Sequence, residues 1–337
     1  MKKVKIGIIG AGRIGQVHAK SISGSISGAE IVAISDPYLD GAKKAADQFG
    51  IPEAYTNYQQ ILQNAAIDAV LICSPTNTHA DIAMEAAKAG KHIFCEKPID
   101  TSVEKILETQ RTIQAAGVKM QIGFNRRFDH NFRRIRTLTE EGKLGEVQIV
   151  KITSRDPEPP SAEYAQNSGG MFLDMTIHDF DMACYQAGSP VEEVFAAGTV
   201  TVDPEIGKAG DIDTAIVTLR FANGALGVID NCRQAVYGYD QRVEVFGTKG
   251  AAAAENDTPT NVKLSTQEAV FSDKPLYFFL ERYMQSFTDE LQAFVDAIRY
   301  DQPVPVSIEA GLEPIRIAIA ANKSMLENRP VKISEIE

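Results

Sequence analysis

Short apolar runs alternate with helical patterns over residues 4–124. The apolar positions within each run are consecutive, which is typical of parallel strands buried on both faces. Segments between them have the composition of helices and carry a glycine at or beside their end, the usual helix stop. The alternation predicts a doubly wound parallel α/β sheet. The predicted strands lie at 4–9, 29–35, 68–75, 92–98 and 119–124, and the clearest helices at 40–50 and 79–91.

The pattern changes after residue 124. Apolar runs now follow one another closely with turn signals between them, which indicates a mostly antiparallel sheet. Two long helical patterns come near the end of the chain. A length of 337 residues also favours two domains, which we place at 1–124 and 125–337. The later runs lie at 146–153, 213–221, 225–232 and 241–247, and the long helices at 275–300 and 308–328.

Composition and charge narrow the function classes. The chain is 44% hydrophobic and 23% charged, as in ordinary globular proteins. A net charge of -11 argues against nonspecific binding to nucleic acid or to an anionic membrane. No apolar segment approaches the roughly 20 residues that span a bilayer, and no signal peptide is evident, so we expect a cytoplasmic protein. The four cysteines are widely spaced and signal neither disulfides nor a cysteine zinc site.

The first chemical motif is "GAGRIG", with Gly10, Gly12 and Gly15 in G-x-G-x-x-G spacing. It follows a predicted strand and opens a helix, and Asp36 ends the second strand, which together are typical of dinucleotide binding. The glycines allow a tight turn and close approach of a pyrophosphate, which the helix N-terminus then binds. A purely structural strand-to-helix turn is the alternative.

Asp36 predicts NAD rather than NADP. A carboxylate at this position accepts hydrogen bonds from the ribose hydroxyls and repels a 2'-phosphate. Arg13, Lys43 and Lys44 leave some use of NADP open, because any of them could reach a phosphate.

The second motif is "CEKP", which places Lys97 at the carboxyl end of a predicted strand. Ligands bind at that edge of an open α/β sheet, so Lys97 is a candidate for the site. The alternative is an ordinary solvated loop lysine.

The third motif is "GGMFLDMTIHDFD", residues 169–181, where acids and a histidine stand among apolar residues. On one helix, Asp174 and His178 would lie four positions apart, with Asp181 and Tyr185 on the same polar stripe. A metal site lacks a second nearby histidine, and a core histidine paired with a carboxylate is the simpler alternative. In a dehydrogenase, a histidine would suit the base that removes a hydroxyl proton.

These three motifs, in this order, resemble the Gfo/Idh/MocA family of glucose-fructose oxidoreductases and inositol dehydrogenases. "MQIGFNRRFD", "CEKP" and "YGYD" are most similar to the inositol 2-dehydrogenases, myo- and scyllo-inositol enzymes included. The resemblance implies an N-terminal Rossmann domain at 1–124. It also implies a C-terminal α/β domain at 125–337, whose large, mostly antiparallel sheet binds substrate and packs between protomers of a homotetramer.

The resemblance also implies residue roles and a cis peptide before Pro98. Lys97 would hydrogen-bond the reacting hydroxyl, Asp174 would bind substrate and orient the imidazole, and His178 would accept the proton. We predict no metal. The predicted cofactor site comprises Gly10, Gly12, Arg13, Ile14, Gly15, Asp36, Ser74, Glu96 and Lys97, and the predicted polyol site comprises Lys97, Asn125, Arg127, Asp174, His178, Tyr237 and Tyr239.

The expected activity is therefore NAD-dependent oxidation of an inositol to an inosose. Relatives of the myo-inositol type tend to have Tyr in place of Phe287 and to lack the double glycine before Asp174, which leaves the isomer open. Three alternatives remain: an aldose 1-dehydrogenase, an NAD-binding sensor without turnover, and an enzyme that retains its NAD between turnovers. A positioned base with two orienting groups disfavours the sensor.

Overall fold

The computed structural model describes residues 2–336, and the chain divides into two compact units. Unit 1 comprises Met1–Phe128 and Gln285–Leu312, and unit 2 comprises Asp129–Met284 and Glu313–Glu337. The first boundary lies close to the predicted one at 124/125. The second domain is not continuous in sequence, however, because residues 285–312 return to unit 1.

Unit 1 contains a six-stranded sheet in which every neighbouring pair is parallel. The order is β3-β2-β1-β4-β5-β6. Strands β2 and β3 are therefore added on one side of β1, and β4, β5 and β6 on the other. Such sheets bind ligands at the switch point between the two halves, here between β1 and β4. This confirms the predicted doubly wound sheet. The strands are β1 (Val4–Ile9), β2 (Ala29–Ser35), β3 (Glu53–Tyr55), β4 (Ala69–Ile72), β5 (His92–Glu96) and β6 (Met120–Gly123).

The helices of unit 1 follow the strands as the pattern predicted. The helix expected at 40–50 spans Leu39–Phe49 and ends at Gly50, whose φ of 67° favours glycine. The helices are α1 (Arg13–Gly24), α2 (Leu39–Phe49), α3 (Gln59–Gln63), η1 (Thr76–Thr78), α4 (His79–Lys88), α5 (Val103–Ala116), η2 (Asn125–Phe128) and α12 (Met284–Arg299).

Helix α12 belongs to unit 1 because its apolar face completes the core of the first sheet. Leu291, Phe294 and Val295 are fully buried in the cluster that also contains Phe94 of β5. The rings of Phe94 and Phe294 lie 5.9 Å apart, edge to face. An amphipathic pattern shows that a helix has a buried face but not which sheet it covers.

The single helix expected at 275–300 is broken in the structure. Residues 275–278 are not helical, α11 spans Phe279–Arg282, and α12 begins at Met284. At the end of α11 the Arg282 guanidinium is buried between the carboxylates of Asp129 and Asp257. The backbone leaves the helix at Tyr283, with φ −114° and ψ 12°. The buried ion pairs of Arg282 thus lie directly before the break in the helical pattern.

Unit 2 contains a seven-stranded sheet in the order β12-β11-β7-β10-β9-β8-β15. Only the β7–β10 pair is parallel among the neighbours, so the sheet is mostly antiparallel, as expected. Three of its strands, β8, β12 and β15, lie outside the predicted runs. The strands are β7 (Val147–Arg155), β8 (Val191–Thr199), β9 (Thr214–Phe221), β10 (Leu226–Cys232), β11 (Asp240–Gly247), β12 (Gly250–Ala254) and β15 (Val331–Lys332).

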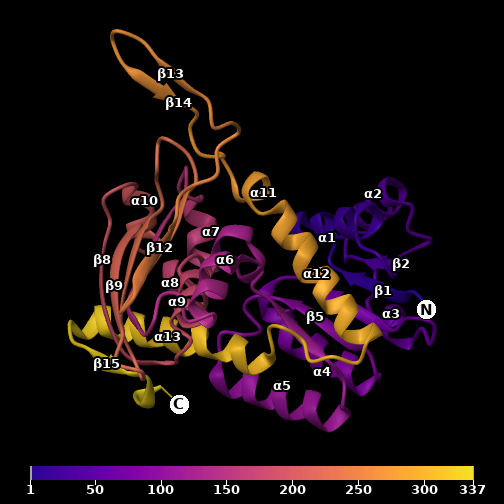
Figure 1. The fold of residues 1–337 in the computed structure, drawn as a ribbon. Coiled ribbons are helices and arrows are strands. Elements are labelled where there is room, and N and C mark those ends of the chain that lie inside the picture. The colour runs from indigo at the N-terminus through magenta and orange to yellow at the C-terminus, as the bar shows by residue number, and fades with distance from the viewer. Residues whose placement is uncertain (1, 337) are drawn as a thin grey trace. The chain divides into compact units, whose positions relative to one another are not determined.

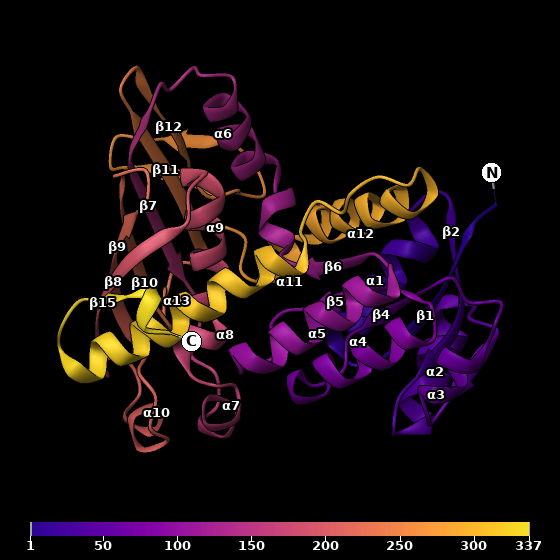
Figure 2. The ribbon, with the colours of Figure 1, turned by 90° about the horizontal axis from the view of Figure 1, so that it is seen from below.

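Helices α6 (His130–Glu140) and α9 (Ile177–Ala187) lie on one face of this sheet (Figures 1 and 2). A hairpin of β13 (Lys263–Ser265) and β14 (Val270–Ser272) extends from the sheet as an arm (Figure 1). No helix in residues 2–336 is long and apolar enough to cross a membrane. The remaining elements are α7 (Ala162–Asn167), α8 (Met171–Asp174), α10 (Pro204–Lys208), α13 (Ile308–Glu327) and η3 (Ile333–Glu335).

Candidate active site

The predicted cofactor residues lie at the carboxyl ends of the strands of unit 1. The glycine turn follows β1, Asp36 follows β2, Ser74 follows β4, and Lys97 follows β5. Because all these strands are parallel, the four segments share one edge of the sheet. The structure thus brings together the two sequence motifs of this unit.

The glycine turn has the close contacts that its spacing predicts. Gly10 has φ 105°, and a Cβ there would lie 2.5 Å from the Cys73 carbonyl oxygen. A Cβ on Gly15 would lie 2.0 Å from the Gly10 carbonyl oxygen, whereas one on Gly12 would meet nothing within 4 Å. The first and third glycines therefore permit tight packing, and the second leaves the backbone open at the start of α1. This arrangement fits the diphosphate of a dinucleotide.

Asp36 is oriented by the backbone at the end of β2. Its two carboxylate oxygens accept hydrogen bonds from the N–H groups of Ala11 and Tyr38, each at 2.9 Å. The side chain is half-buried, and each oxygen keeps a lone pair for a ribose hydroxyl. A fixed carboxylate beside the glycine turn fits NAD.

A histidine that the sequence did not single out links two of these loops. His79 is buried, and its Nδ1 and Nε2 lie 2.7 Å from the carbonyl oxygens of Pro98 and Ser74 respectively. The imidazole therefore ties the segment after β4 to the segment after Lys97. Lys97 itself is half-buried, and the Lys97–Pro98 peptide is cis, as expected.

Asp174 and His178 do not lie on one continuous helix, which corrects the sequence prediction. Asp174 ends the short helix α8, and His178 lies in the first turn of α9. Between the two helices, Thr176 is fully buried and donates its hydroxyl to Asn231 at 2.7 Å. This buried side-chain bond lies where the helical pattern is interrupted. Within α9, His178, Asp181 and Tyr185 keep the helical spacing of the expected polar stripe, and Asp181 is fully buried.

Asp174 is held by two side chains that sequence reasoning missed. The Tyr164 hydroxyl donates to it at 3.0 Å and the Arg233 guanidinium at 3.2 Å. Arg233 is buried and also lies 3.6 Å from Asp156 and 4.0 Å from Asp211. Its one sequence signal is its position directly after the run at 225–232. These contacts orient the Asp174 carboxylate and balance its charge.

The two tyrosines of the predicted polyol site differ in their surroundings. The Tyr237 hydroxyl donates to Asp240 at 2.6 Å and accepts from Arg155 at 3.2 Å. Burial and the Asp240 hydrogen bond raise the pKa of Tyr237. Tyr239 is buried with its ring 6.0 Å from that of Tyr283.

Burial alone would raise the pKa of Asp240, but hydrogen bonds from Arg242, Tyr237 and Asn256 outweigh it and lower that pKa. The ionised carboxylate therefore fixes the Tyr237 hydroxyl. Two other predicted substrate residues, Asn125 and Arg127, lie in η2 of unit 1, the former buried and the latter half-buried.

Two clusters among the described residues have a geometry that could hold a metal ion, and neither contains Asp174 or His178. One comprises Asp129, His130 and Asp257, where Arg282 already pairs with both acids. The other comprises His18, Glu96 and Glu290 inside unit 1.

Comparison with known families covers most of the chain. Residues 4–124 match the Gfo/Idh/MocA model described as an oxidoreductase family with an NAD-binding Rossmann fold. Residues 132–253 match the C-terminal domain model of the same family. These matches confirm the predicted fold class, the resemblance and NAD as the cofactor.

Relatives are similar over nearly their whole length. The chain is 51% identical to an uncharacterized oxidoreductase of Bacillus subtilis, covering 100% of this chain and 98% of that one. It is 47% identical to the myo-inositol 2-dehydrogenase of Thermotoga maritima, covering 99% of both. The solved scyllo-inositol dehydrogenase of Lactobacillus casei, with bound NAD(H) and scyllo-inositol, superposes with a TM-score of 0.93 at 34% identity, covering 99% of this chain and 100% of that one.

Proposed function

Because this chain belongs to the Gfo/Idh/MocA oxidoreductase family, we propose that it oxidises an inositol, scyllo or myo, to the corresponding inosose with NAD. The observation that carries this proposal is full-length similarity to a solved protein with NAD(H) and scyllo-inositol bound. Similarity at 47% identity to a myo-inositol 2-dehydrogenase supports the same substrate class.

Each candidate residue has a role that its surroundings support. His178 accepts the hydroxyl proton: its half-buried imidazole lies in the first turn of α9, four positions after Asp174. Asp174, oriented by Arg233 and Tyr164, accepts a hydrogen bond from substrate or imidazole. Lys97 donates to the reacting hydroxyl. Bound NAD supplies the acceptor for the hydride that leaves the same carbon.

The charges of the candidate site favour a neutral polyol. In unit 2 the buried Arg233 is surrounded by three carboxylates, so its positive charge is already compensated. A sugar phosphate or a diacid needs uncompensated positive charge, whereas ring hydroxyls need paired donors and acceptors. An isomer that turns one hydroxyl away leaves a buried group unpaired, at a cost of about 1–3 kcal/mol.

The test is kcat/KM with NAD across scyllo-inositol, myo-inositol, D-chiro-inositol and common aldoses, followed as NADH absorbance. We expect an inositol to be preferred by at least about tenfold, since one lost hydrogen bond accounts for that ratio. Preference for an aldose by the same margin would identify an aldose 1-dehydrogenase. Binding of NAD without turnover of any polyol would indicate a sensor.

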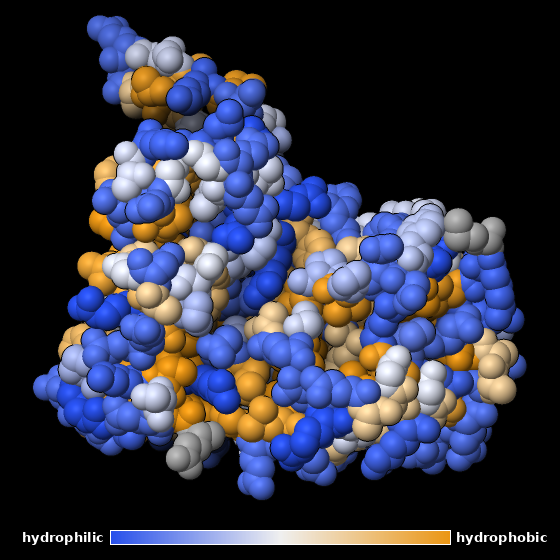
Figure 3. Space-filling view, turned by 60° about the horizontal axis from the view of Figure 1, so that its bottom comes forward, coloured by the Kyte–Doolittle hydropathy of each residue, from blue (hydrophilic) through white to orange (hydrophobic). Residues whose placement is uncertain are grey.

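We also propose a homotetramer, for which the open face of the unit 2 sheet is the support. Ile149 of β7 lies beside Leu226 of β10 and Phe246 of β11, and all three are between 44% and 49% exposed. The β13–β14 arm carries further exposed apolar side chains, visible at the upper left of Figure 3. Contiguous exposed apolar surface of this kind marks protein–protein interfaces. A cytoplasmic location stays a prediction from the sequence.

A further inference from the structure

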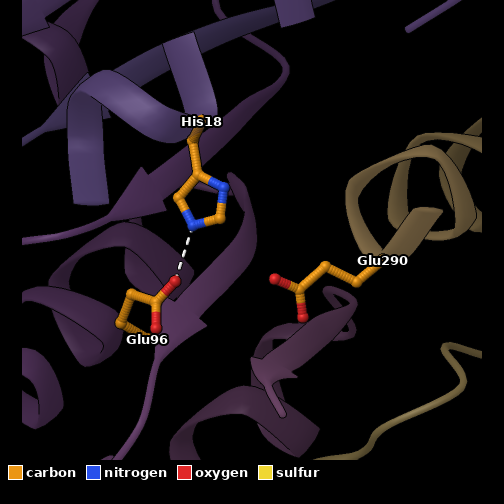
Figure 4. A group of neighbouring side chains, drawn as sticks. All are labelled: His18, Glu96 and Glu290. Atoms are coloured by element: carbon orange, nitrogen blue, oxygen red, sulfur yellow. Dashed lines mark hydrogen bonds and ion pairs between the residues drawn. The ribbon is translucent and has the colours of Figure 1, made fainter. Parts of the chain in front are cut away.

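Three titratable side chains from distant parts of the sequence meet inside unit 1. His18 comes from α1, Glu96 ends β5, and Glu290 comes from α12 (Figure 4). His18 and Glu290 are fully buried, and the Glu96 side chain is 13% exposed. His18 Nε2 lies 2.6 Å from Glu96 Oε1, so the imidazole and this carboxyl group are hydrogen-bonded. We refer to these three residues as the buried triad.

Glu290 has no donor to stabilise a negative charge. Neither of its carboxylate oxygens has a hydrogen-bond partner among the described residues, although the carboxylate points toward His18 and Glu96 in Figure 4. One ligand atom from each member of the triad lies within 4.8 Å of the others. A rotation of the Glu290 side chain or one bridging water spans such a gap. Two ionised carboxylates this close in a buried site would repel each other strongly.

Aromatic rings, an amide and a thiol lie around the triad. The rings of Phe94 and Phe287 present edges to His18 at 5.2 and 5.8 Å. Gln121 of β6 donates its amide to the backbone oxygen of Glu290, not to its carboxylate. Cys73, after β4, is half-buried, and desolvation followed by the nearby Glu96 carboxylate raises the pKa of its thiol well above the ordinary value, so the thiol stays neutral. One imidazole therefore faces two carboxyl groups.

We propose that the carboxyl groups of Glu96 and Glu290 hold one proton between them, Glu290 as the neutral acid, and that the buried triad positions Lys97. The proposal rests on the proposed function, because it assigns positioning residues to that reaction. Burial, with the nearby Glu96 carboxylate as the second cause, raises the pKa of Glu290 well above its ordinary range, in agreement with the neutral form.

The link to Lys97 is direct in sequence and in packing. Glu96 is the last residue of β5, immediately before Lys97. On its other side, a Cβ on Gly123 of β6 would lie 3.1 Å from Glu96 Oε2, so the neighbouring strand leaves Glu96 little room. His18 lies on α1, the helix that the glycine turn opens. The His18–Glu96 hydrogen bond therefore ties the strand end before Lys97 to the cofactor helix, and Glu290 places the carboxyl group of α12 beside that bond.

A metal ion is the competing occupant of this cluster. Two ligands of one tetrahedral zinc ion, each about 2.0–2.2 Å from the metal, lie more than about 3 Å apart. His18 Nε2 and Glu96 Oε1 are closer than this, at hydrogen-bond distance. The geometry points to a proton rather than a metal, and elemental analysis distinguishes the two.

The first test needs no enzymatic activity. The infrared difference spectrum of wild type minus Glu290→Gln at neutral pH should contain the C=O stretch of a protonated carboxylic acid, shifted in D₂O. Asp289→Asn, on the same helix, is the control: this variant should keep the band, so the band should be absent from the spectrum of wild type minus Asp289→Asn. Absence of the band would overturn the proposal, as would one equivalent of bound zinc or manganese in the purified protein.

The second test uses stability against pH. The pKa of Glu290 in the folded protein is raised above its ordinary value of 4.5. The neutral acid therefore makes its full contribution to stability below pH 4.5, and this contribution is lost as the pH rises through the native pKa. The Tm of wild type minus the Tm of Glu290→Gln should therefore decrease as the pH rises across this window, and then become constant. A difference independent of pH would contradict a shared proton. Asp289→Asn should instead parallel wild type.

The third test addresses positioning. Glutamine mimics the neutral acid, so Glu290→Gln should keep kcat within about threefold of wild type, whereas Glu290→Leu should lower kcat by about tenfold or more with little change in KM for NAD. Equal losses in both variants would overturn the positioning role. If no polyol is oxidised at all, the proposed function fails, and the infrared and Tm measurements still decide on the shared proton.

Discussion

At the scale of single residues, Asp174 shows how a candidate catalytic carboxylate is supported. A charged group at a half-buried position is costly unless it is paired, and Asp174 accepts from both Tyr164 and Arg233. Arg233 is in turn balanced by Asp156 and Asp211. The charges of Asp174 and Arg233 are thus paired within unit 2, independently of any ligand.

The first prediction at this scale concerns the base. His178→Ala should lower kcat for polyol oxidation by roughly 10²–10⁴-fold, the usual contribution of general-base catalysis. NAD affinity, measured by calorimetry, should change little, because the glycine turn and Asp36 belong to unit 1. His130→Ala, at a largely exposed histidine, is the control. Near-normal turnover in His178→Ala would remove His178 from the mechanism.

The second prediction at this scale concerns cofactor choice. Asp36→Ser combined with Pro37→Arg should shift the kcat/KM ratio toward NADP, because a repelling carboxylate is replaced by a phosphate partner. Both cofactors are compared on wild type and variant with one substrate. Wild type should prefer NAD. If it already favours NADP, Asp36 does not bind the ribose as we infer.

At the scale of elements, the double glycine is required by the backbone that leads into Asp174. Gly169 and Gly170 have φ of 88° and 81°, and Gly170 combines this with ψ 175°, a region nearly closed to other residues. A Cβ on Gly170 would also lie 3.0 Å from Asp211 Oδ1. The turn thus allows α8 to begin beside Asp211, which accepts from the Met171 N–H at 2.9 Å.

Gly170→Ala should therefore destabilise the protein by about 1–3 kcal/mol, the cost of such a backbone conformation in a non-glycine residue. Urea unfolding measures the change. The matched control is Gly41→Ala in α2, where a Cβ meets nothing within 4 Å and no positive φ is required. That substitution should stabilise by about 0.5–1 kcal/mol. Equal effects at both positions would show that the strain at Gly170 is not significant.

At the scale of the whole molecule, the open face of the unit 2 sheet determines the predicted assembly. Ile149→Glu places a charge among Leu226 and Phe246 and should convert the tetramer to smaller species in light scattering coupled to gel filtration. Leu326→Glu, at an apolar residue that is 81% exposed on α13, is the control and should leave the mass unchanged. A monomeric wild type would contradict the proposed assembly.

Local patterns in the sequence determined the elements and motifs whose physics is local. Consecutive apolar residues predicted the buried parallel strands, and the spacing of Gly10, Gly12 and Gly15 predicted the turn whose contacts the structure confirms. The order of motifs along the chain sufficed for the family. The roles of Lys97, Asp174 and His178 stay predictions.

Only the tertiary structure decided which distant residues meet. Three arrangements bring together residues from separate elements: Arg233 with Asp174, His79 with two loops, and Glu290 with His18 and Glu96. No local periodicity in the sequence encodes such pairs. The return of α12 to unit 1 and the break near Arg282 have the same origin. A helical pattern specifies a buried face, but the sheet that buries it and the ion pairs beside its break depend on the folded chain as a whole.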